Sequence, residues 1–461
     1  MNLRPGVDTH PPDFFLLVRL NLPFDQRDRV IGFLQALEAV SREKLSPTRV
    51  HGVEPGKSDN PLSPQFVVRD LALNLLVGFG LRFFLGPLGQ RTSEEPIPNF
   101  PPGGVFAPRN PTRFGITGRH VPLYLRTMNA AGDDVWIRKR LTTSDGKPPA
   151  DDAVSAEYRR WLEQSEADLI LVFEADNLFL VVDYWDAVRK AAIVPFGAQV
   201  VAIHEAFNRG DGRDHTGFND GISNLVDRMQ TDPVWYRSKI YLPHPAPAYP
   251  GEPDWNRDDP SYDGGTYLVH RKYVENLQRW RDGTFKVTDY YGQTYSDSEA
   301  REHAVGRRED SGLVISRFHD RPLDREPDSA EVNLAYNESH VLKARGGATA
   351  PFTGDFPPVK PGGTNVFNTQ DIRIRRRGVN FSEIDPLTGA VTYGLHFICF
   401  QNNIQQTGFE FINNIWLMNP HFRRSTDTMF DPDNGIIFPT EGCYYFVPAE
   451  HRHYPGDIFF D

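Results

Sequence analysis

The stretch Gly217-Phe218-Asn219-Asp220-Gly221 sets a carboxylate between two glycines at a fixed spacing. Glycine adopts backbone angles that other residues avoid, and it lets a chain pass close to a bulky ligand. The carboxylate of Asp220 is therefore aimed by the backbone as well as by its own rotamer. An isolated Asp-Gly pair is also typical of an ordinary turn. The residues around this stretch, and the order of motifs along the chain, decide between the two interpretations.

Residues 215–224, HTGFNDGISN, resemble the GxxDG segment of the dye-decolourising (DyP-type) haem peroxidases, often written HFGFxDGISQP. The second and last positions of the run depart from that wording, whereas the five core positions agree with it. The resemblance implies that Asp220 is the acid–base group of a haem site, with Gly217 and Gly221 beside the cofactor. It also requires a haem ligand and then a distal cation further along the chain.

Haem iron in peroxidases is held by a neutral histidine nitrogen, and this chain has 14 histidines. His340 lies in residues 339–343, SHVLK, at the end of a polar, helix-like segment that starts near Ala330. This run resembles the family's proximal histidine segment, commonly AHIRK, which implies that His340 is the axial ligand of the iron. A carboxylate is then expected on the other ring nitrogen of His340, and Asp427 is the candidate.

Residues 373–378, RIRRRG, form a basic cluster later in the chain. Such a cluster is also typical of a solvated basic strand. It resembles the family's ILRRG, and alignment on the closing glycine implies that Arg376 is the arginine above the haem. Because side chains alternate along a strand, Ile374 and Arg376 share one face, and Arg375 and Arg377 share the other.

Further partial matches to the family extend the resemblance over residues 165–448. They lie, in order, at residues 167–171, 263–269, 306–312, 394–401 and 446–448. Within the third of these, Arg308 is a candidate ligand of a haem propionate, because arginine suits carboxylates. For Arg308 and Asp427 a surface ion pair is an equally open interpretation. The long insertions are similar to those of the larger, unexported members. Because residues 1–13 have neither an apolar h-region nor a twin arginine, we expect a cytoplasmic protein.

The composition excludes several classes of protein. With 39% hydrophobic and 12% aromatic residues, the chain is that of an ordinary globular protein rather than a disordered one. The formal net charge of -11 argues against nucleic-acid binding through phosphates. Its two cysteines form no CxxC or CxxCH, so covalent haem attachment is not indicated. No run is long and apolar enough to span a bilayer, so we expect no membrane partner.

The order of expected elements predicts the fold. Strands are predicted near residues 14–22, 65–77, 169–173 and 199–203, with helices at 25–41 and 178–190, the latter burying Leu178, Val181, Val182 and Trp185. The second part repeats this order with strands near 266–269, 372–379, 395–401 and 443–447 and helices at 273–281 and 408–418. Gly/Pro-rich insertions are predicted at 78–126 and 346–368.

This β-α-β-β-α-β order is the split βαβ arrangement. We therefore expect an α+β fold of two ferredoxin-like units with antiparallel sheets, of the dimeric α/β-barrel type. Residues 1–210 would form an N-terminal unit with long insertions. Residues 211–461 would form a C-terminal unit that holds the haem.

The resemblance implies a haem peroxidase with one non-covalent haem b per chain. It would reduce hydrogen peroxide and oxidise small organic donors such as dyes and phenolics through high-valent iron. The alternative is a non-enzymatic haem-binding or haem-handling protein on the same fold, because fold does not fix function. An RNA-binding module and a metal hydrolase fit less well, since neither an RNP-type run nor an HExxH occurs. The oligomeric state stays open.

Overall fold

The computed structural model describes the chain in the following ranges: 13–22, 27–45, 51–56, 65–70, 73–80, 82–83, 167–209, 211–218, 232–242, 264–289, 292–312, 315, 338–345, 373–384, 386–404, 408–409, 412–417, 427–431, 435–449 and 453–460. Asp220 and Gly221 lie outside these ranges. So do the expected insertion at 346–368 and most of that at 78–126.

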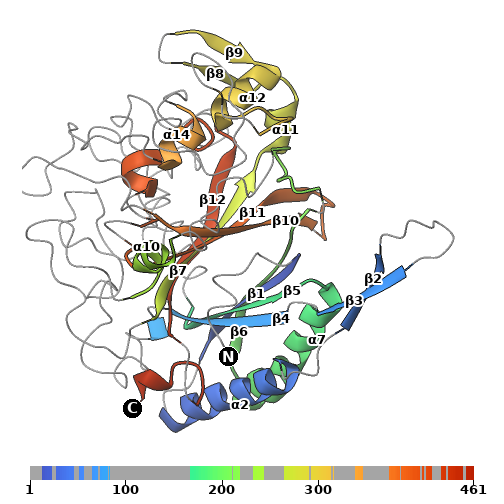
Figure 1. Cartoon of the computed structure of the whole chain (residues 1–461), viewed down its shortest axis with the longest axis vertical. Helices are drawn as coiled ribbons and strands as arrows, with labels where there is room; N and C mark the ends of the chain where they lie inside the picture. The colour runs from blue at the N-terminus through green and yellow to red at the C-terminus, as the bar shows by residue number, and fades with distance from the viewer. Residues whose placement is uncertain are drawn as a thin grey trace, which may run out of the picture.

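Eight strands close into one antiparallel barrel with the order β1-β5-β4-β12-β7-β11-β10-β6 (Figure 1). The first half of the chain supplies four of them: β1 (Phe14–Asn21), β4 (Leu73–Gly80), β5 (Leu169–Ala175) and β6 (Gln199–Phe207). The second half supplies the other four: β7 (Thr266–Glu275), β10 (Arg375–Ile384), β11 (Val391–Gln401) and β12 (Ile437–Val447). The structure is therefore an α+β fold, and all eight expected strands are present.

Two joints connect the halves of the barrel. At one joint β4 pairs with β12, where Phe79 lies opposite Phe446. At the other, Asn380 of β10 lies opposite Phe207 of β6. At the first joint the chain needs glycine, because a Cβ at Gly80 would lie 2.1 Å from the carbonyl oxygen of Ala167.

Helices α2 (Arg27–Leu45) and α7 (Leu178–Val188) cover the outside of the first-half strands. The predicted apolar positions of α2 are buried, namely Val30, Phe33, Leu34 and Leu37. The predicted face of α7 is wrong in part, because Leu178 and Val182 are exposed. Its buried stripe is instead Val181, Tyr184 and Val188, since Tyr184 packs edge-on against Phe173 of β5.

In the second half, the helix predicted over residues 273–281 is shorter than expected. Strand β7 continues to Glu275, and α11 covers only Leu277–Arg281. β7 is paired along both edges, by β11 and β12, and this pairing holds residues with a helical pattern in the sheet. The other elements of this half are α10 (Pro233–Ile240), β8 (Lys286–Thr288), β9 (Thr294–Ser296), α12 (Asp297–Val305), α14 (His340–Arg345), η5 (Ile412–Leu417) and η7 (Asp457–Phe459).

The remaining described elements belong to the first half. Strands β2 (His51–Gly56) and β3 (Gln65–Asp70) pair as a separate hairpin. A π-helical turn, η2 (Arg189–Ile193), and a short helix, α8 (Val194–Phe196), follow α7. None of the helices within the described ranges has both the length and the apolar character that crossing a bilayer demands.

Alternation along the strands separates two environments. One set of side chains fills the barrel interior with apolar groups from all eight strands, among them Phe15, Leu17, Ile398, Phe400 and Tyr445. Within this interior the guanidinium of Arg377 pairs with the carboxylate of Glu174 at 3.1 Å, and both are buried. The alternate set faces outward, toward the helices of each half.

Candidate functional site

The imidazole of His340 is tied to a buried carboxylate. Its Nδ1 lies 2.8 Å from Oδ2 of Asp427, which is completely buried, whereas the side chain of His340 is 29% exposed. The sequence places His340 at the end of a helical segment, but it is the first residue of α14. Within the described part of the chain, this is the one hydrogen bond of the His340 side chain, so Nε2 is available to a ligand.

Asp427 is itself held rigidly. Its Oδ1 accepts from the backbone N–H of Met429 at 2.9 Å, and its own backbone N–H donates to the carbonyl oxygen of Leu417 at 2.9 Å. The backbone N–H of Thr428 donates to the carbonyl oxygen of Glu338, two residues before His340, at 3.1 Å. The loop that carries the carboxylate and the start of α14 are therefore connected through the backbone, which fixes the geometry of the pair.

A series of aromatic contacts places His340 over the outer face of the C-terminal strands. The His340 ring stacks near Phe430, with 5.8 Å between centroids and 29° between planes. Phe430 meets Tyr273 of β7 edge-on at 5.4 Å, and Tyr273 meets Phe397 of β11 at 6.0 Å. In Figure 1, α14 accordingly lies beside the second-half strands, on the side away from α2 and α7.

Arg376 belongs to the same outer face. In the sheet it lies opposite Cys399 of β11, which lies opposite Val269 of β7. The flanking residues Arg375 and Arg377 are buried. They alternate with Arg376 along β10, so they lie on the same side of the strand as the interior residues Val379 and Phe381. Ile374 packs against the outer cluster, as the predicted alternation requires. The structure thus separates Arg376 from its two neighbours and directs it to the face that His340 overlies.

The predicted propionate ligand, Arg308, is paired with Glu302 and is partly exposed. Its neighbour Arg307 is buried and donates to the carbonyl oxygen of Gly312 at 2.9 Å. Burial, together with the nearby charge of Arg376, lowers the pKa of Arg307 to about 10. Arg307 and Arg376 are therefore close enough for their charges to interact, and the two cations form a positive region.

Sequence reasoning also missed Arg271. This buried residue of β7 has its guanidinium 4.3 Å from the Tyr444 ring centroid and 4.9 Å from that of Phe409. It has the same strand parity as Val269, so it belongs to the outer face. The signal was a charged residue two positions after the apolar strand motif that ends at Val269, with the same parity as Val269.

The first half of the GxxDG segment is well fixed. Gly217 has φ +97°, a conformation that favours glycine, and its carbonyl oxygen accepts from Arg213. The carbonyl oxygen of Thr216 accepts from the indole N–H of Trp280 at 2.9 Å, and Phe218 is buried. Asp220 and Gly221, the other predicted residues of this segment, lie outside the described ranges.

Sequence comparison relates part of this chain to known proteins. Residues 362–452 match the family model described as Dyp-type peroxidase, C-terminal. The chain is similar to the multifunctional dye peroxidase DyP2 of an Amycolatopsis species, with 24% identity over 51% of this chain and 53% of that protein. It is also similar to the dye-decolorizing peroxidase msp1 of Mycetinis scorodonius, with 26% identity over 46% of this chain and 44% of that protein. The chain thus spans about half the length of these curated relatives.

Solved structures show the same fold. A DyP-type peroxidase from Cellulomonas bogoriensis superposes with a TM-score of 0.55 at 21% identity, covering 99% of this chain and 95% of that one. DtpA from Streptomyces lividans superposes with a TM-score of 0.58 at 16% identity, covering 100% of this chain and 96% of that one. The fold and the site define an α+β barrel protein with a carboxylate-bound histidine over one sheet. Residues 362–452 match the C-terminal region of the DyP-type peroxidases, and the whole chain has the fold of the solved DyP-type peroxidase from Cellulomonas bogoriensis.

Proposed function

We propose that this protein is a haem peroxidase that reduces hydrogen peroxide and oxidises small organic donors such as dyes and phenolics. The observation that carries the proposal is the His340–Asp427 pair over the sheet face that presents Arg376. A protein that only carries haem needs the histidine ligand. It has no need of a cation on the side of the haem opposite that histidine. The non-enzymatic alternative is therefore not favoured.

The cofactor in this proposal is one non-covalent haem b per chain. Nε2 of His340 would hold the iron, since Nδ1 is engaged by Asp427. The outer face offers both aromatic side chains and the positive region formed by Arg307 and Arg376, which suits the propionates of a porphyrin. Arg308 and Gly217, with Gly221 beyond the described ranges, would complete the surroundings. When bound, the haem supplies the redox chemistry.

The protein's own residues have three tasks in this proposal. Asp427 accepts the Nδ1 proton of His340, which fixes the ring orientation and raises the basicity of Nε2. Asp220 would transfer a proton between the two oxygens of the peroxide, a role in which an acid–base group contributes about 10²–10⁴-fold. Arg376 stabilises the negative charge that develops on the leaving oxygen, a contribution on the order of 3 kcal/mol.

The finer organisation of the fold is also part of the proposal. Residues 1–210 and 211–461 would form two ferredoxin-like units, with the haem in the second. The strand orders β4-β5-β1-β6 and β12-β7-β11-β10 support this, because each has the split βαβ connection.

The test is reconstitution of the purified chain with haem. We expect a Soret band that changes within seconds of peroxide addition, followed by turnover of an organic dye. His340→Ala should lose the ligation spectrum, while His453→Ala, a change of an exposed histidine near the C-terminal 3₁₀ turn, should keep it. A chain that takes up no haem, or a His340→Ala variant with the parent spectrum, would refute the proposal.

A further inference from the structure

A second group of ionisable side chains lies inside one end of the barrel, on the opposite side of the C-terminal strands from His340. It consists of Arg19, His204, His270, Lys272, Glu383, His396 and Glu441. These residues come from six different strands, β1, β6, β7, β10, β11 and β12. None of them has a role in the peroxidase chemistry proposed above. Seven ionisable groups in a barrel interior that is otherwise largely apolar call for a function.

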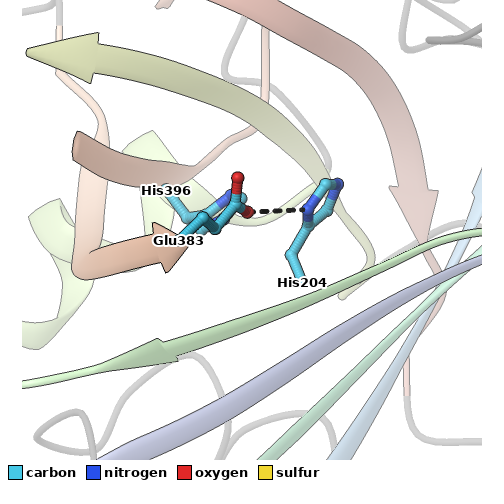
Figure 2. A group of neighbouring side chains, drawn as sticks. All are labelled: His204, Glu383 and His396. Atoms are coloured by element: carbon cyan, nitrogen blue, oxygen red, sulfur yellow. Dashed lines mark ion pairs between the residues drawn. The ribbon is translucent and has the colours of Figure 1, made fainter. Parts of the chain in front are cut away.

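Three of them converge as metal ligands do. One ligand atom from each of His204, Glu383 and His396 lies within 4.8 Å of the other two. Figure 2 shows the Glu383 carboxylate beside His396 and paired with His204, which β6 contributes from the other half of the chain. The centroids of the two imidazole rings are 4.8 Å apart. Nδ1 of His204 lies 3.7 Å from Oε1 of Glu383.

In both His204 and His396, one ring nitrogen already has another partner. Nε2 of His204 lies 3.1 Å from Oε2 of Glu441, and Nδ1 of His396 lies 3.0 Å from Nε2 of His270. Metal-bound histidines commonly have this second contact, which fixes the tautomer and the ring orientation. Nδ1 of His204 and Nε2 of His396 therefore take no part in these two contacts.

An unsatisfied atom points independently to a ligand. His396 is completely buried, and its Nε2 has no hydrogen-bond partner within the described part of the chain. A buried polar atom without a partner costs about 1–3 kcal/mol, so such atoms call for an explanation. A bound cation at the centre of the group would satisfy it.

We propose that His204 Nδ1, the Glu383 carboxylate and His396 Nε2 bind one divalent transition-metal ion of the zinc type. Three protein ligands of the His₂Glu kind leave a fourth position for water. Tetrahedral coordination with metal–nitrogen bonds of about 2.0–2.1 Å sets the ligand atoms about 3.3 Å apart. The widest pair must therefore close by up to about 1.5 Å. Of the three ligands Glu383 has the most room to move, because its side chain is 43% exposed whereas both histidines are buried.

Lys272 competes with the ion. Its Nζ lies 2.7 and 2.8 Å from the two oxygens of Glu383, and it would have to release them on metal binding. Glu441 offers Lys272 a second carboxylate, 3.8 Å from Nζ, while Arg19 pairs with the same Glu441. On metal binding, the Glu383 carboxylate would therefore exchange its contact with Lys272 for one with the ion. The strength of the Lys272–Glu383 contact would then limit the affinity of the site for the metal.

The experiment uses the full chain without added haem, titrated with Zn²⁺ by calorimetry and with Co²⁺ by visible absorption. We expect one ion per chain and a tetrahedral Co²⁺ spectrum. Glu383→Gln should weaken binding at least tenfold. Lys272→Met should strengthen it about tenfold, since methionine keeps the packing over the Phe381 ring, 4.9 Å from Nζ. His340→Ala should bind like the parent, which separates this site from the haem site.

Two results would overturn the proposal. One is equal affinity for the parent and Glu383→Gln, which would place the ion elsewhere. The other is the lack of a bound ion in Lys272→Met, in which the competing charge has been removed. Glu383 is the principal position for the test because it is partly exposed, so its conversion to the isosteric amide preserves the fold. The outcome does not depend on whether the chain is a peroxidase.

Discussion

Nδ1 of His340 and Oδ2 of Asp427 lie 2.8 Å apart although the residues are 87 positions apart in the chain. The carboxylate is fully buried, and its second oxygen accepts from the backbone N–H of Met429. A buried carboxylate held in this way stays oriented toward the ring, so it controls how strongly Nε2 donates to a ligand.

Asp427→Asn should therefore weaken the proposed activity without removing the histidine. An amide keeps the acceptor for Met429 but carries no charge, so the basicity of His340 falls. Loss of such a supporting carboxylate typically costs about 10–100-fold in activity or affinity. Steady-state dye oxidation measures the loss, and the Soret position of the loaded protein reports ligation. Unchanged turnover together with an unchanged spectrum would show that the contact is structural only.

Arg376→Leu should lower turnover about 10²–10³-fold while leaving haem uptake in place. The reason is that its guanidinium would act on charge developing in the reaction, and one preorganised donor contributes about this factor. Arg189→Leu, a change of an exposed arginine on the π-helical turn η2, serves as the control and should behave like the parent. Stopped-flow mixing with peroxide separates the reaction step from donor oxidation. Equal rates in both variants would remove Arg376 from the site.

The interior pair Arg377–Glu174 should contribute to stability rather than to activity. It links β10 with β5 across the barrel, at 3.1 Å. Burial raises the pKa of Glu174 in spite of the nearby arginine. Arg377→Met leaves that carboxyl without its cation and should lower the free energy of unfolding by about 3–5 kcal/mol.

Urea unfolding of the variant and of the double variant Arg377→Met/Glu174→Leu provides the check. The double variant removes both charges, so it should regain most of the lost stability. If the double variant is less stable than the single one, then the carboxyl is supported by groups other than Arg377.

Glu275 should make stability depend on pH. Burial, together with the charge of Asp214, raises the pKa of this carboxyl to about 8 from its ordinary 4.5. Between these values the folded chain binds a proton that the unfolded chain has lost. The contribution of Glu275 to the free energy of unfolding is therefore largest below pH 4.5, and it decreases as the pH rises from 4.5 to 8.

Glu275→Gln imitates the protonated form and should remove this decrease. The variant should match the parent near pH 4.5 and exceed its free energy of unfolding at pH 9 by on the order of 5 kcal/mol. Thermal or urea unfolding at the two pH values measures the difference. An equal difference at both would show that the carboxyl is not protonated in the folded chain.

The sequence was sufficient for the local features. Apolar runs of strand length predicted the eight strands. Apolar residues at helical spacing predicted α2 and the face of α2 that is buried. Alternation alone correctly grouped Ile374 with Arg376. These patterns are readable because each depends only on the geometry of a short segment.

Other features depended on contacts that no short segment contains. Residues 273–275 have a helical pattern but belong to strand β7. Pairing with β11 and β12 on both edges provides hydrogen-bond partners for their backbone N–H and C=O groups. Packing on β5 buried Tyr184 in place of Leu178. The sequence alone also could not distinguish the buried Arg307 from the paired Arg308.

The sequence by itself determined the succession of strands and helices along the chain, the candidate histidine and the face of Arg376. Only the tertiary structure decided that Asp427 meets His340 and that His204, Glu383 and His396 meet inside the barrel. The physical reason is that barrel closure joins strands far apart in the chain, and the distances between their side chains follow from register and twist rather than from spacing in the sequence.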